Sequence, residues 1–209
     1  MAELQDSKDL SRAVVARREI FRGFAFGLVS EDVLLAPADP HPATRDFVDH
    51  PGAVAIVALR EEKGEPEVLL LRQYRHPVRA LLWEVPAGLL DVEGEDPAAA
   101  AARELAEEAS LRADRWDVLV DYFTTPGGNS ESLRIFLARD LQAAPLPAGF
   151  TRQAEERDME LRWVPLSQAV QAVHAGHLHN PSAVVGVLAT ASALADPRRL
   201  RPVDAHWLR

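Results

Sequence analysis

The chain of 209 residues has no cysteine, only two methionines and no long uninterrupted apolar run. Without cysteine it can form no disulfide scaffold, no thiolate zinc site and no cysteine nucleophile. Any bound metal must therefore use carboxylates, carbonyls or the seven histidines. The longest apolar candidate, Ala183–Ala195, is interrupted by Ser and Thr. Because a membrane span needs about 18 apolar residues or more, none is expected.

Positive charge is scarce: 23 basic residues face 32 acidic ones, giving a net charge of −9. Nucleic-acid binding needs a clustered basic face, so no nucleic-acid partner is expected. A small anionic substrate can still bind through local arginines or a bridging cation. Residues 1–18 alternate charges with short apolar pieces and lack a signal-peptide core, which favours a soluble, cytoplasmic protein.

The composition is 47% apolar, enough to bury a real core in one domain with a modest appendage. Short apolar runs between turn residues predict strands, and two helices are expected near the end, one after Ser167 and a buried one after Ser182. The predicted strands are Ala13–Ala16, Ile20–Leu28, Val33–Ala36, Ala53–Leu59, Val68–Gln73, Leu81–Val85, Val118–Thr124, Leu133–Ala138 and Glu160–Val164, with a surface connection over Ala143–Gly149. This order predicts an α/β (α+β) core over residues 51–209 and a strand-rich N-terminal segment over residues 1–50.

One further helix is predicted over Pro97–Ser110. Asp96 is a good N-cap, Pro97 suits the first helical position, and five alanines follow without a breaker. At about 100° per residue, Ala98, Ala101, Ala102 and Ala109 cluster around Leu105 and predict the buried face.

Three carboxylates, Glu104, Glu107 and Glu108, form a stripe beside that face. Like charges one turn apart destabilise a helix, so the stripe calls for a compensating cation. Arg103 can pair with Glu107 at i,i+4, which leaves Glu104 and Glu108 for another role. Hard oxygen ligands suit Mg²⁺ or Mn²⁺ bridging to phosphates. For a bare glutamate pair, a solvated acidic face would be the ordinary interpretation.

The surrounding stretch resembles the Nudix box. That pattern is Gly, five residues, Glu, seven residues, then Arg-Glu-apolar-x-Glu-Glu-x-Gly-apolar. The matching residues are Gly88, Glu95, Arg103, Glu104, Leu105, Glu107, Glu108 and Leu111. The chain departs from it twice: six residues separate Gly88 from Glu95, and Ser110 replaces the last glycine.

This resemblance implies a Nudix fold, with a mixed sheet flanked by helices, and a pyrophosphohydrolase activity on a nucleoside diphosphate linked to another group. It implies that Glu104 and Glu108, with the backbone carbonyl of Ala87, hold divalent ions, and Glu107 is counted with them. Arg103 is included among the catalytic residues. Carboxylate-held Mg²⁺ or Mn²⁺ would neutralise the diphosphate oxygens and activate a water.

Features outside the box resemble the ADP-ribose pyrophosphatase branch. Pro126 lies fifteen residues after Leu111, and the loop that follows contains Glu131, which the resemblance makes the first candidate for general base. Glu107 or Glu108 is the competing base. A glycine-rich loop would let Glu131 swing in only when substrate is bound. Arg75 matches an arginine that contacts the substrate's phosphates, a role that suits its forked donors.

The N-terminal strands resemble a segment that this branch exchanges between two subunits, which implies a homodimer. Arg45 and Asp46 fall where that segment reaches the partner's substrate site. Phe24 or Phe26 could stack on adenine, although a core position is the more ordinary expectation. Trp163 is expected to pack in the core.

The predicted reaction is therefore metal-dependent hydrolysis of ADP-ribose to AMP and ribose 5-phosphate. Three alternatives stay open: a pyrophosphatase for another nucleotide sugar such as GDP-mannose, a non-catalytic Nudix-like ligand sensor, and an assembly scaffold. The intact carboxylates argue against the sensor. His174, His177 and His179 lie close together in sequence, but exposed helix-end histidines explain them better than a zinc site.

Overall fold

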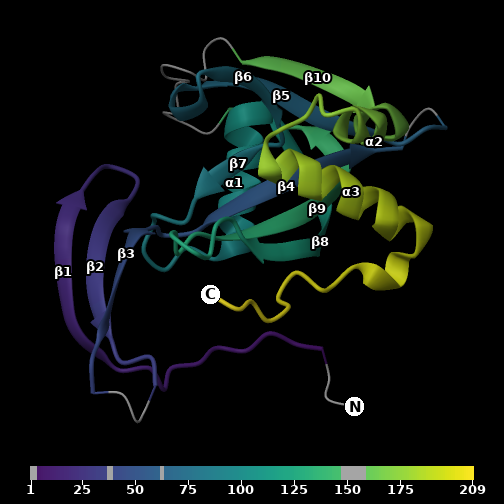
Figure 1. The fold of residues 1–209 in the computed structure, drawn as a ribbon. Coiled ribbons are helices and arrows are strands. Elements are labelled where there is room, and N and C mark those ends of the chain that lie inside the picture. The colour runs from purple at the N-terminus through teal and green to yellow at the C-terminus, as the bar shows by residue number, and fades with distance from the viewer. Residues whose placement is uncertain (1–3, 37–39, 62–63, 147–158) are drawn as a thin grey trace.

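The computed structural model describes residues 4–36, 40–61, 64–146 and 159–209, whose strands form two separate sheets (Figure 1). The small N-terminal sheet contains β1 (Val14–Arg22), β2 (Gly27–Val33) and β3 (Ala43–Asp49). The large sheet contains β4 (Ala53–Arg60), β5 (Glu67–Arg75), β6 (Ala80–Glu84), β7 (Ala87–Leu89), β8 (Leu111–Phe123), β9 (Ser132–Ala143) and β10 (Glu160–Pro165). The expected N-terminal antiparallel appendage and mixed sheet are confirmed.

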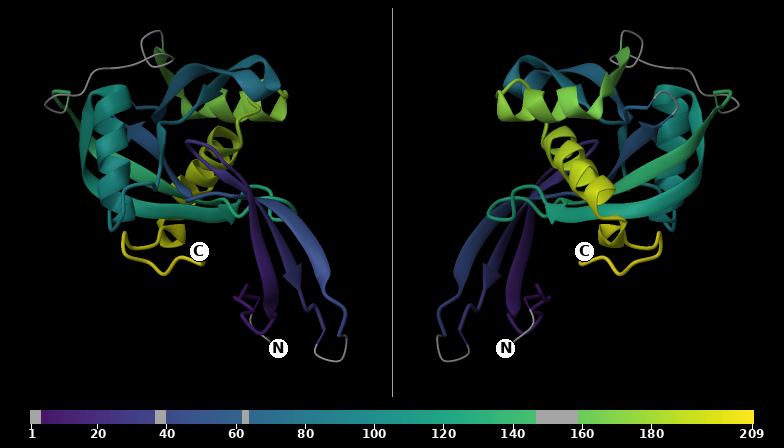
Figure 2. Two further views of the ribbon diagram at one scale, coloured as in Figure 1. Left: turned by 90° about the vertical axis from the view of Figure 1, so that its left-hand side faces the viewer. Right: turned by 90° about the vertical axis from the view of Figure 1, so that its right-hand side faces the viewer.

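The N-terminal sheet is antiparallel in the order β1-β2-β3 and projects away from the rest of the molecule (Figure 2). The strand expected over Ile20–Leu28 is wrong, because residues 23–26 turn the chain back and the Gly23 N–H donates to the Phe26 carbonyl at 2.9 Å. The strand expected over Val33–Ala36 is also wrong, since β2 ends at Val33. The sequence interpretation missed β3, a strand rich in polar residues with no apolar run to mark it.

The large sheet has the order β10-β5-β4-β9-β8, with β6 beside β5 and β7 beside β4. Its central pair, β4 and β9, is parallel, and the other pairs are antiparallel, so the sheet is mixed. Buried strands with side chains covered on both faces read as continuous apolar runs, as Ala53–Leu59 does. The short strand β7 carries the first residues of the box alongside β4.

The helices cover both faces of this sheet. Alternate residues of β4 point to opposite faces, so Val54 and Ile56 pack with α1 (Pro97–Ala109) while Ala55 and Val57 pack with α2 (Leu166–His174) and α3 (Pro181–Ala195). The described part of the chain also contains the short 3-10 turns η1 (His76–Val78) and η3 (Pro197–Arg199). The result is a layered α/β core whose α1 side carries the box carboxylates.

Several helix details differ from the sequence interpretation by a few residues. Helix α1 ends at Ala109, α2 begins at Leu166, and α3 begins at Pro181 behind an Asn180 N-cap. Six residues of α3 are buried, as expected for it: Ser182, Ala183, Gly186, Val187, Thr190 and Ala193. Ala102 is exposed and Ala100 is buried instead, because the carboxylate side of α1 also packs against the sheet.

The remaining sequence predictions are borne out in part. Trp163 packs against the core beneath the guanidinium of Arg60, as expected. The expected connection over Ala143–Gly149 begins at the end of β9, and its residues 147–149 lie outside the described part of the chain. Among the helices that the structure describes, none is long and apolar enough to cross a membrane.

Candidate active site

The box of this chain has one residue more than the usual pattern between Gly88 and Glu95, and the loop before α1 accommodates it. The Glu95 N–H donates to the Val92 carbonyl at 3.2 Å, closing a turn in which Gly94 has φ of +77°. Such a turn requires positive φ at its third position, which glycine adopts without strain. The side chain of Asp96 then caps α1 by accepting from the N–H groups of Ala98 and Ala99. The helix therefore starts in the register that the box requires.

Gly88 brings β7 against the carboxylate stripe of α1. A Cβ atom placed on Gly88 would lie 2.1 Å from Cδ of Glu104, far inside van der Waals contact. Glycine is required here for space, since only a bare backbone allows the Glu104 carboxylate to lie this close. The box glycine and the helix glutamate, sixteen residues apart, thus form one contact.

Ser110, at the last glycine position of the box, has the left-handed backbone that glycine favours. Its φ is 54°, and its N–H donates to the Ala106 carbonyl at 3.0 Å to close the helix. A serine with this backbone costs roughly 1 kcal/mol relative to glycine. The substitution changes the helix end and leaves the carboxylates in place.

Arg103 is surrounded by three carboxylates of the box. Its Nε and Nη2 donate to the two oxygens of Glu95, both at 3.1 Å, and its Nη1 donates to Glu104 at 2.6 Å and to Glu107 at 3.3 Å. The expected pairing of Arg103 with Glu107 is present, but the expectation that it leaves Glu104 for another role is wrong, because the same guanidinium also binds Glu104 and Glu95. These hydrogen bonds, the one to Glu95 first, raise the pKa of Arg103 above its usual range. Arg103 is therefore the fixed cation that the stripe was expected to need.

Glu108 holds the backbone just before the box glycine. Its Oε2 accepts a hydrogen bond from the Ala87 N–H at 2.9 Å, which ties the end of α1 to β7. The two residues predicted to share a metal ion, Ala87 and Glu108, are thus in contact. Within the described residues, however, no group of three or more His, Asp or Glu side chains is arranged to hold a metal ion.

Arg75 and Glu84 form a two-pronged ion pair on neighbouring strands β5 and β6. Nε of Arg75 donates to Oε1 of Glu84 at 2.8 Å and Nη2 donates to Oε2 at 2.7 Å. The Glu84 side chain is 3% exposed whereas that of Arg75 is 44% exposed. A buried carboxylate that binds two donors fixes the plane of the guanidinium, and the Arg75 side chain is still partly exposed at the cleft.

Glu131 lies in the segment between β8 and β9, residues 124–131, which we call the Glu131 loop. Its Oε2 accepts from the Thr124 hydroxyl at 2.8 Å and from Asn129 Nδ2 at 3.5 Å. Its Oε1 lies 3.8 Å from Nε2 of His50. Burial, with a smaller contribution from the charge of Glu131, raises the pKa of the nearby Tyr122 phenol. Glu131 is therefore a partly buried carboxylate with defined partners on both oxygens.

A single cleft with a volume of about 820 Å³ brings most of these groups together. Its lining includes Arg75, Glu84, Ala87, Gly88 and Glu131. Glu104 and Glu108 adjoin it through their contacts with Gly88 and Ala87. The volume falls within the usual range for small-molecule sites, about 300–1,000 Å³.

Two predicted site residues stand apart from this cleft. Arg45 and Asp46 lie on β3, paired with Glu31 and Ser30 of β2 in the N-terminal sheet. Neither lines the cleft. Within this chain the structure does not bring them to the other predicted residues.

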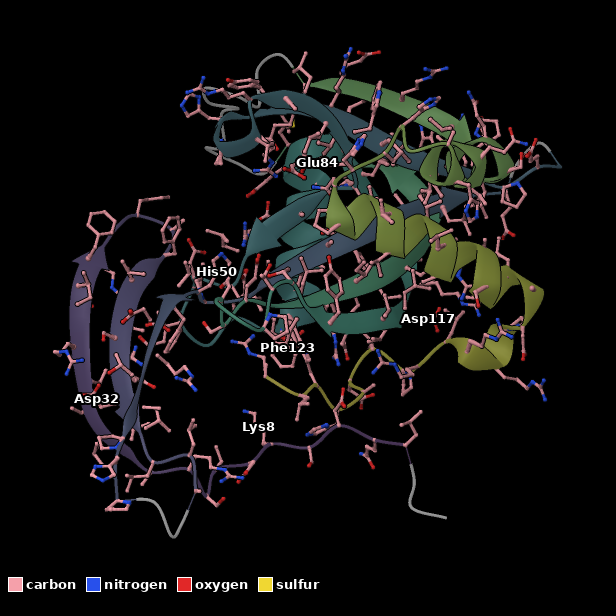
Figure 3. All side chains as sticks on the ribbon, in the orientation of Figure 1. Lys8, Asp32, His50, Glu84, Asp117 and Phe123 are labelled. Atoms are coloured by element: carbon pink, nitrogen blue, oxygen red, sulfur yellow. The ribbon has the colours of Figure 1, made fainter. Side chains whose placement is uncertain are left out.

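Sequence reasoning missed several residues that line the cleft, including His50, Glu84, Asn129 and Ser182. Figure 3 labels two of them: His50, where the N-terminal sheet joins the large sheet, and Glu84 on β6. A charged residue at the end of the apolar strand Ala80–Glu84 was a usable signal for a buried ion pair. His50 offered no signal in sequence, because its partner lies 81 positions later.

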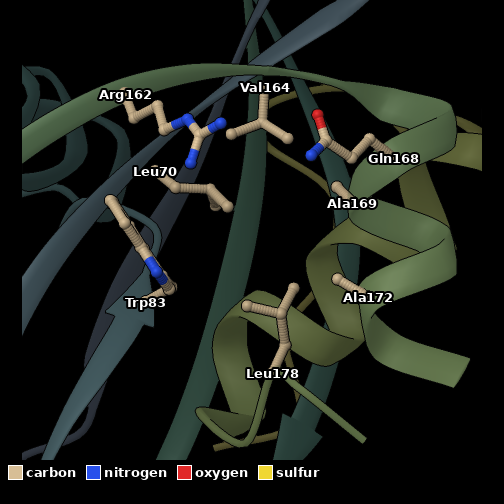
Figure 4. A pocket seen from close by; sticks show the side chains of 8 residues that line it. All are labelled: Leu70, Trp83, Arg162, Val164, Gln168, Ala169, Ala172 and Leu178. Atoms are coloured by element: carbon tan, nitrogen blue, oxygen red, sulfur yellow. The ribbon is translucent and has the colours of Figure 1, made fainter. Parts of the chain in front are cut away.

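A second hollow, of about 90 Å³, lies between β5, β6, β10 and α2 (Figure 4). Its lining is mostly aliphatic, with Trp83 and Arg162 at one side. The hollow is too small for a nucleotide and contains none of the predicted site residues. His174, His177 and His179 are exposed, as the ordinary interpretation of them expected.

The fold and the box geometry define a Nudix-type protein, and comparisons with known proteins agree. The model of the NUDIX domain family matches residues 49–183, so the chain belongs to the Nudix family. The ADP-ribose pyrophosphatase of Mycobacterium tuberculosis is 44% identical over 79% of this chain and 77% of that protein. The ADP-ribose pyrophosphatase of Bacillus subtilis is 31% identical over 83% of this chain and 89% of that protein.

A solved structure described as an ADP compounds hydrolase shares the fold. Its TM-score is 0.70 at 21% sequence identity, and the match covers 92% of this chain and 100% of that one. The predicted Nudix fold is thereby confirmed.

Proposed function

We propose that this chain is an ADP-ribose pyrophosphatase that hydrolyses ADP-ribose to AMP and ribose 5-phosphate, with the cytoplasm as its expected location. The observation that carries the proposal is the cleft, in which an oriented arginine, a partly buried glutamate and the box backbone line one space. The likeness to two ADP-ribose pyrophosphatases over more than three quarters of the chain supports the choice of substrate.

The box residues suit a divalent ion. Carboxylates of Glu104, Glu107 and Glu108 and the carbonyl of Ala87 are hard oxygen donors, and the bare backbone of Gly88 lets the Glu104 carboxylate lie against β7. These residues would hold Mg²⁺ or Mn²⁺, which when bound offsets the charge of the diphosphate and lowers the pKa of a bound water. Arg103 positions Glu95, Glu104 and Glu107 in a fixed arrangement.

The remaining roles follow from charge and position. Arg75, oriented by Glu84, binds the diphosphate oxygens from the lining of the cleft, where its guanidinium is partly exposed. Glu131 accepts a proton from the attacking water as general base, with Thr124 and Asn129 holding its other oxygen. Glu107 and Glu108 are the competing bases. The glycines before Glu131 allow it to move when substrate binds.

The proposal includes a homodimer assembled through residues 1–50, with residues 51–209 as the catalytic domain. The expectation that Phe24 or Phe26 lies in the chain's own core is wrong: both are exposed, Phe24 fully. Phe21 and Ile20 of the same sheet are also more than half exposed. Exposed apolar side chains gathered on one element support contact with another surface. In such a dimer Arg45 and Asp46 would reach the partner's substrate.

The first test is a phosphate-release assay, coupled to a phosphatase, on ADP-ribose, GDP-mannose, UDP-glucose and NADH. Each substrate is run with Mg²⁺, with Mn²⁺ and with EDTA. The expected result is selective, EDTA-sensitive release of AMP from ADP-ribose. Preference for GDP-mannose would keep the chemistry and replace the substrate. Tight binding of ADP-ribose without turnover would overturn the proposal in favour of a ligand sensor.

A further inference from the structure

The Glu131 loop is tied to the segment that connects the two sheets. The Val48 N–H donates to the Gly128 carbonyl and the Ser130 N–H donates to the Val48 carbonyl, both at 3.0 Å. The backbone N–H of His50 donates to Ser130 Oγ at 2.9 Å. Three hydrogen bonds thus align residues 48–50 beside residues 128–130, and they place the side chain of His50 next to Glu131.

The ring of His50 has a defined orientation. Its Nδ1 accepts a hydrogen bond from the Gly52 N–H at 3.1 Å, so in the neutral ring the proton sits on Nε2. Nε2 faces Oε1 of Glu131 at 3.8 Å, within ion-pair distance and slightly beyond hydrogen-bond distance. The His50 side chain is 11% exposed, so packing holds this arrangement.

The two oxygens of Glu131 therefore have different partners. Thr124 and Asn129 donate to Oε2, and Nε2 of His50 lies 3.8 Å from Oε1. A carboxylate anchored at one oxygen can still rotate, and a donor beside the second oxygen fixes its plane. General-base catalysis depends on that plane, because the base must point a lone pair at the attacking water.

We propose that His50 is a positioning residue for the general base: its Nε2–H sets the orientation of the Glu131 carboxylate in the cleft. The inference rests on the proposed function, because it takes Glu131 as the base. His50 acts through Glu131 and makes no contact with substrate in this role.

Two substitutions of His50 distinguish its contact with the Gly52 N–H from its contact with Glu131. In His50→Asn, the side-chain oxygen can still accept from the Gly52 N–H, but the shorter side chain cannot reach Glu131. In His50→Gln, the amide nitrogen can occupy the place of Nε2 and keeps a donor for Glu131. We expect kcat for ADP-ribose to fall about 10- to 100-fold in His50→Asn with KM within about twofold, and Gln to restore most of it. His177→Asn, at an exposed helix end, is the matched control.

The same substitution in the Glu131→Gln background tests whether His50 acts through Glu131. If it does, His50→Asn lowers kcat no further there, because the group it positions is already lost. A full additional loss, an unchanged kcat in the single variant, or no recovery with Gln would each overturn the inference. Thermal unfolding of every variant shows whether a loss of kcat reflects loss of fold, and the Gln comparison decides the case if Asn unfolds.

The Glu131→Gln variant alone separates this inference from the proposed function. Near-normal turnover in Glu131→Gln would remove the base assignment and the role of His50 with it. A large loss in Glu131→Gln, with no effect of His50→Asn, would leave the proposed function standing and reject only the positioning role.

Discussion

The two sheets of this molecule are each stabilised by a different kind of interaction. In β4 of the large sheet, Ala53–Leu59 are at most 6% exposed, and helices cover both faces. In the N-terminal sheet, β1 is exposed along nearly its whole length, and its cross-strand contacts include the ion pairs Arg17–Glu31 and Arg18–Asp32. Exposed ion pairs contribute far less to stability than burial of an apolar side chain, because water and salt screen them. The large sheet is therefore stabilised by a core of its own, whereas β1 of the small sheet buries little apolar surface within this chain.

The largest effect is expected from a change of one atom in the box. Glu108→Gln keeps an acceptor for the Ala87 N–H but removes the carboxylate charge, so AMP release should fall about a thousandfold, roughly 4 kcal/mol in barrier. The unfolding temperature should stay the same, which would show that Glu108 serves the reaction and not the stability of the core. Glu93→Gln, in the exposed loop before α1, is the control. Near-normal turnover in Glu108→Gln would contradict the metal assignment.

A cavity in the core should destabilise the large sheet. Leu105 of α1 is fully buried, so Leu105→Ala should lower the free energy of unfolding by about 2–5 kcal/mol. Urea unfolding followed by circular dichroism measures the loss. Leu161→Ala, at a side chain 39% exposed, should cost much less. Equal losses at both sites would argue against a core centred on α1.

A polar substitution in the N-terminal sheet should act on assembly instead. Phe21 is 57% exposed, and its burial against a partner would contribute about 1.5–3 kcal/mol, so Phe21→Ser should weaken the proposed dimer by at least tenfold. Analytical ultracentrifugation over a range of concentrations measures the dissociation constant. Val203→Ser, on the surface of the large domain, should leave it unchanged. A monomer at all concentrations in the unmodified protein would reject the dimer.

The smallest effect is expected at the end of α1. Ser110→Gly relieves a left-handed backbone, and the gain is partly offset by the greater freedom of glycine in the unfolded chain. The free energy of unfolding should rise by about 0.5–1 kcal/mol. Thermal denaturation checks the sign. A loss of stability in Ser110→Gly would show that the serine side chain contributes a contact of its own.

Local patterns predicted the elements whose determinants are local. Asp96 and Pro97 fixed the start of α1, and the apolar run Ala53–Leu59 gave β4, because caps and periodicity lie within a few residues. The turn at residues 23–26 was missed because Phe24, Ala25 and Phe26 continue an apolar run across it. Strand β3 was missed because its pairing with β2, rather than burial, defines it.

Part of the candidate site was predictable for the same reason. The box carboxylates are spaced along one helix, so their grouping follows from the helical period. Arg75 and Glu131 are instead oriented by residues outside the box. Glu84 binds Arg75 from the neighbouring strand, and His50 lies beside Glu131 although the two are far apart in sequence. Only the folded chain brings such pairs together.

The two glycine positions of the box tolerate substitution to different degrees, because glycine is favoured at each for a different reason. At position 88 any side chain collides with the Glu104 carboxylate, so a lineage that loses this glycine would have to move that carboxylate out of its present place. At position 110 the demand is only on backbone angle, which this chain has already met with serine. A motif search that penalises both glycine positions equally would score a sequence that has changed only position 110 as low as one that has changed position 88. Weighting each motif position by the physical reason for its residue would keep such distant members in view.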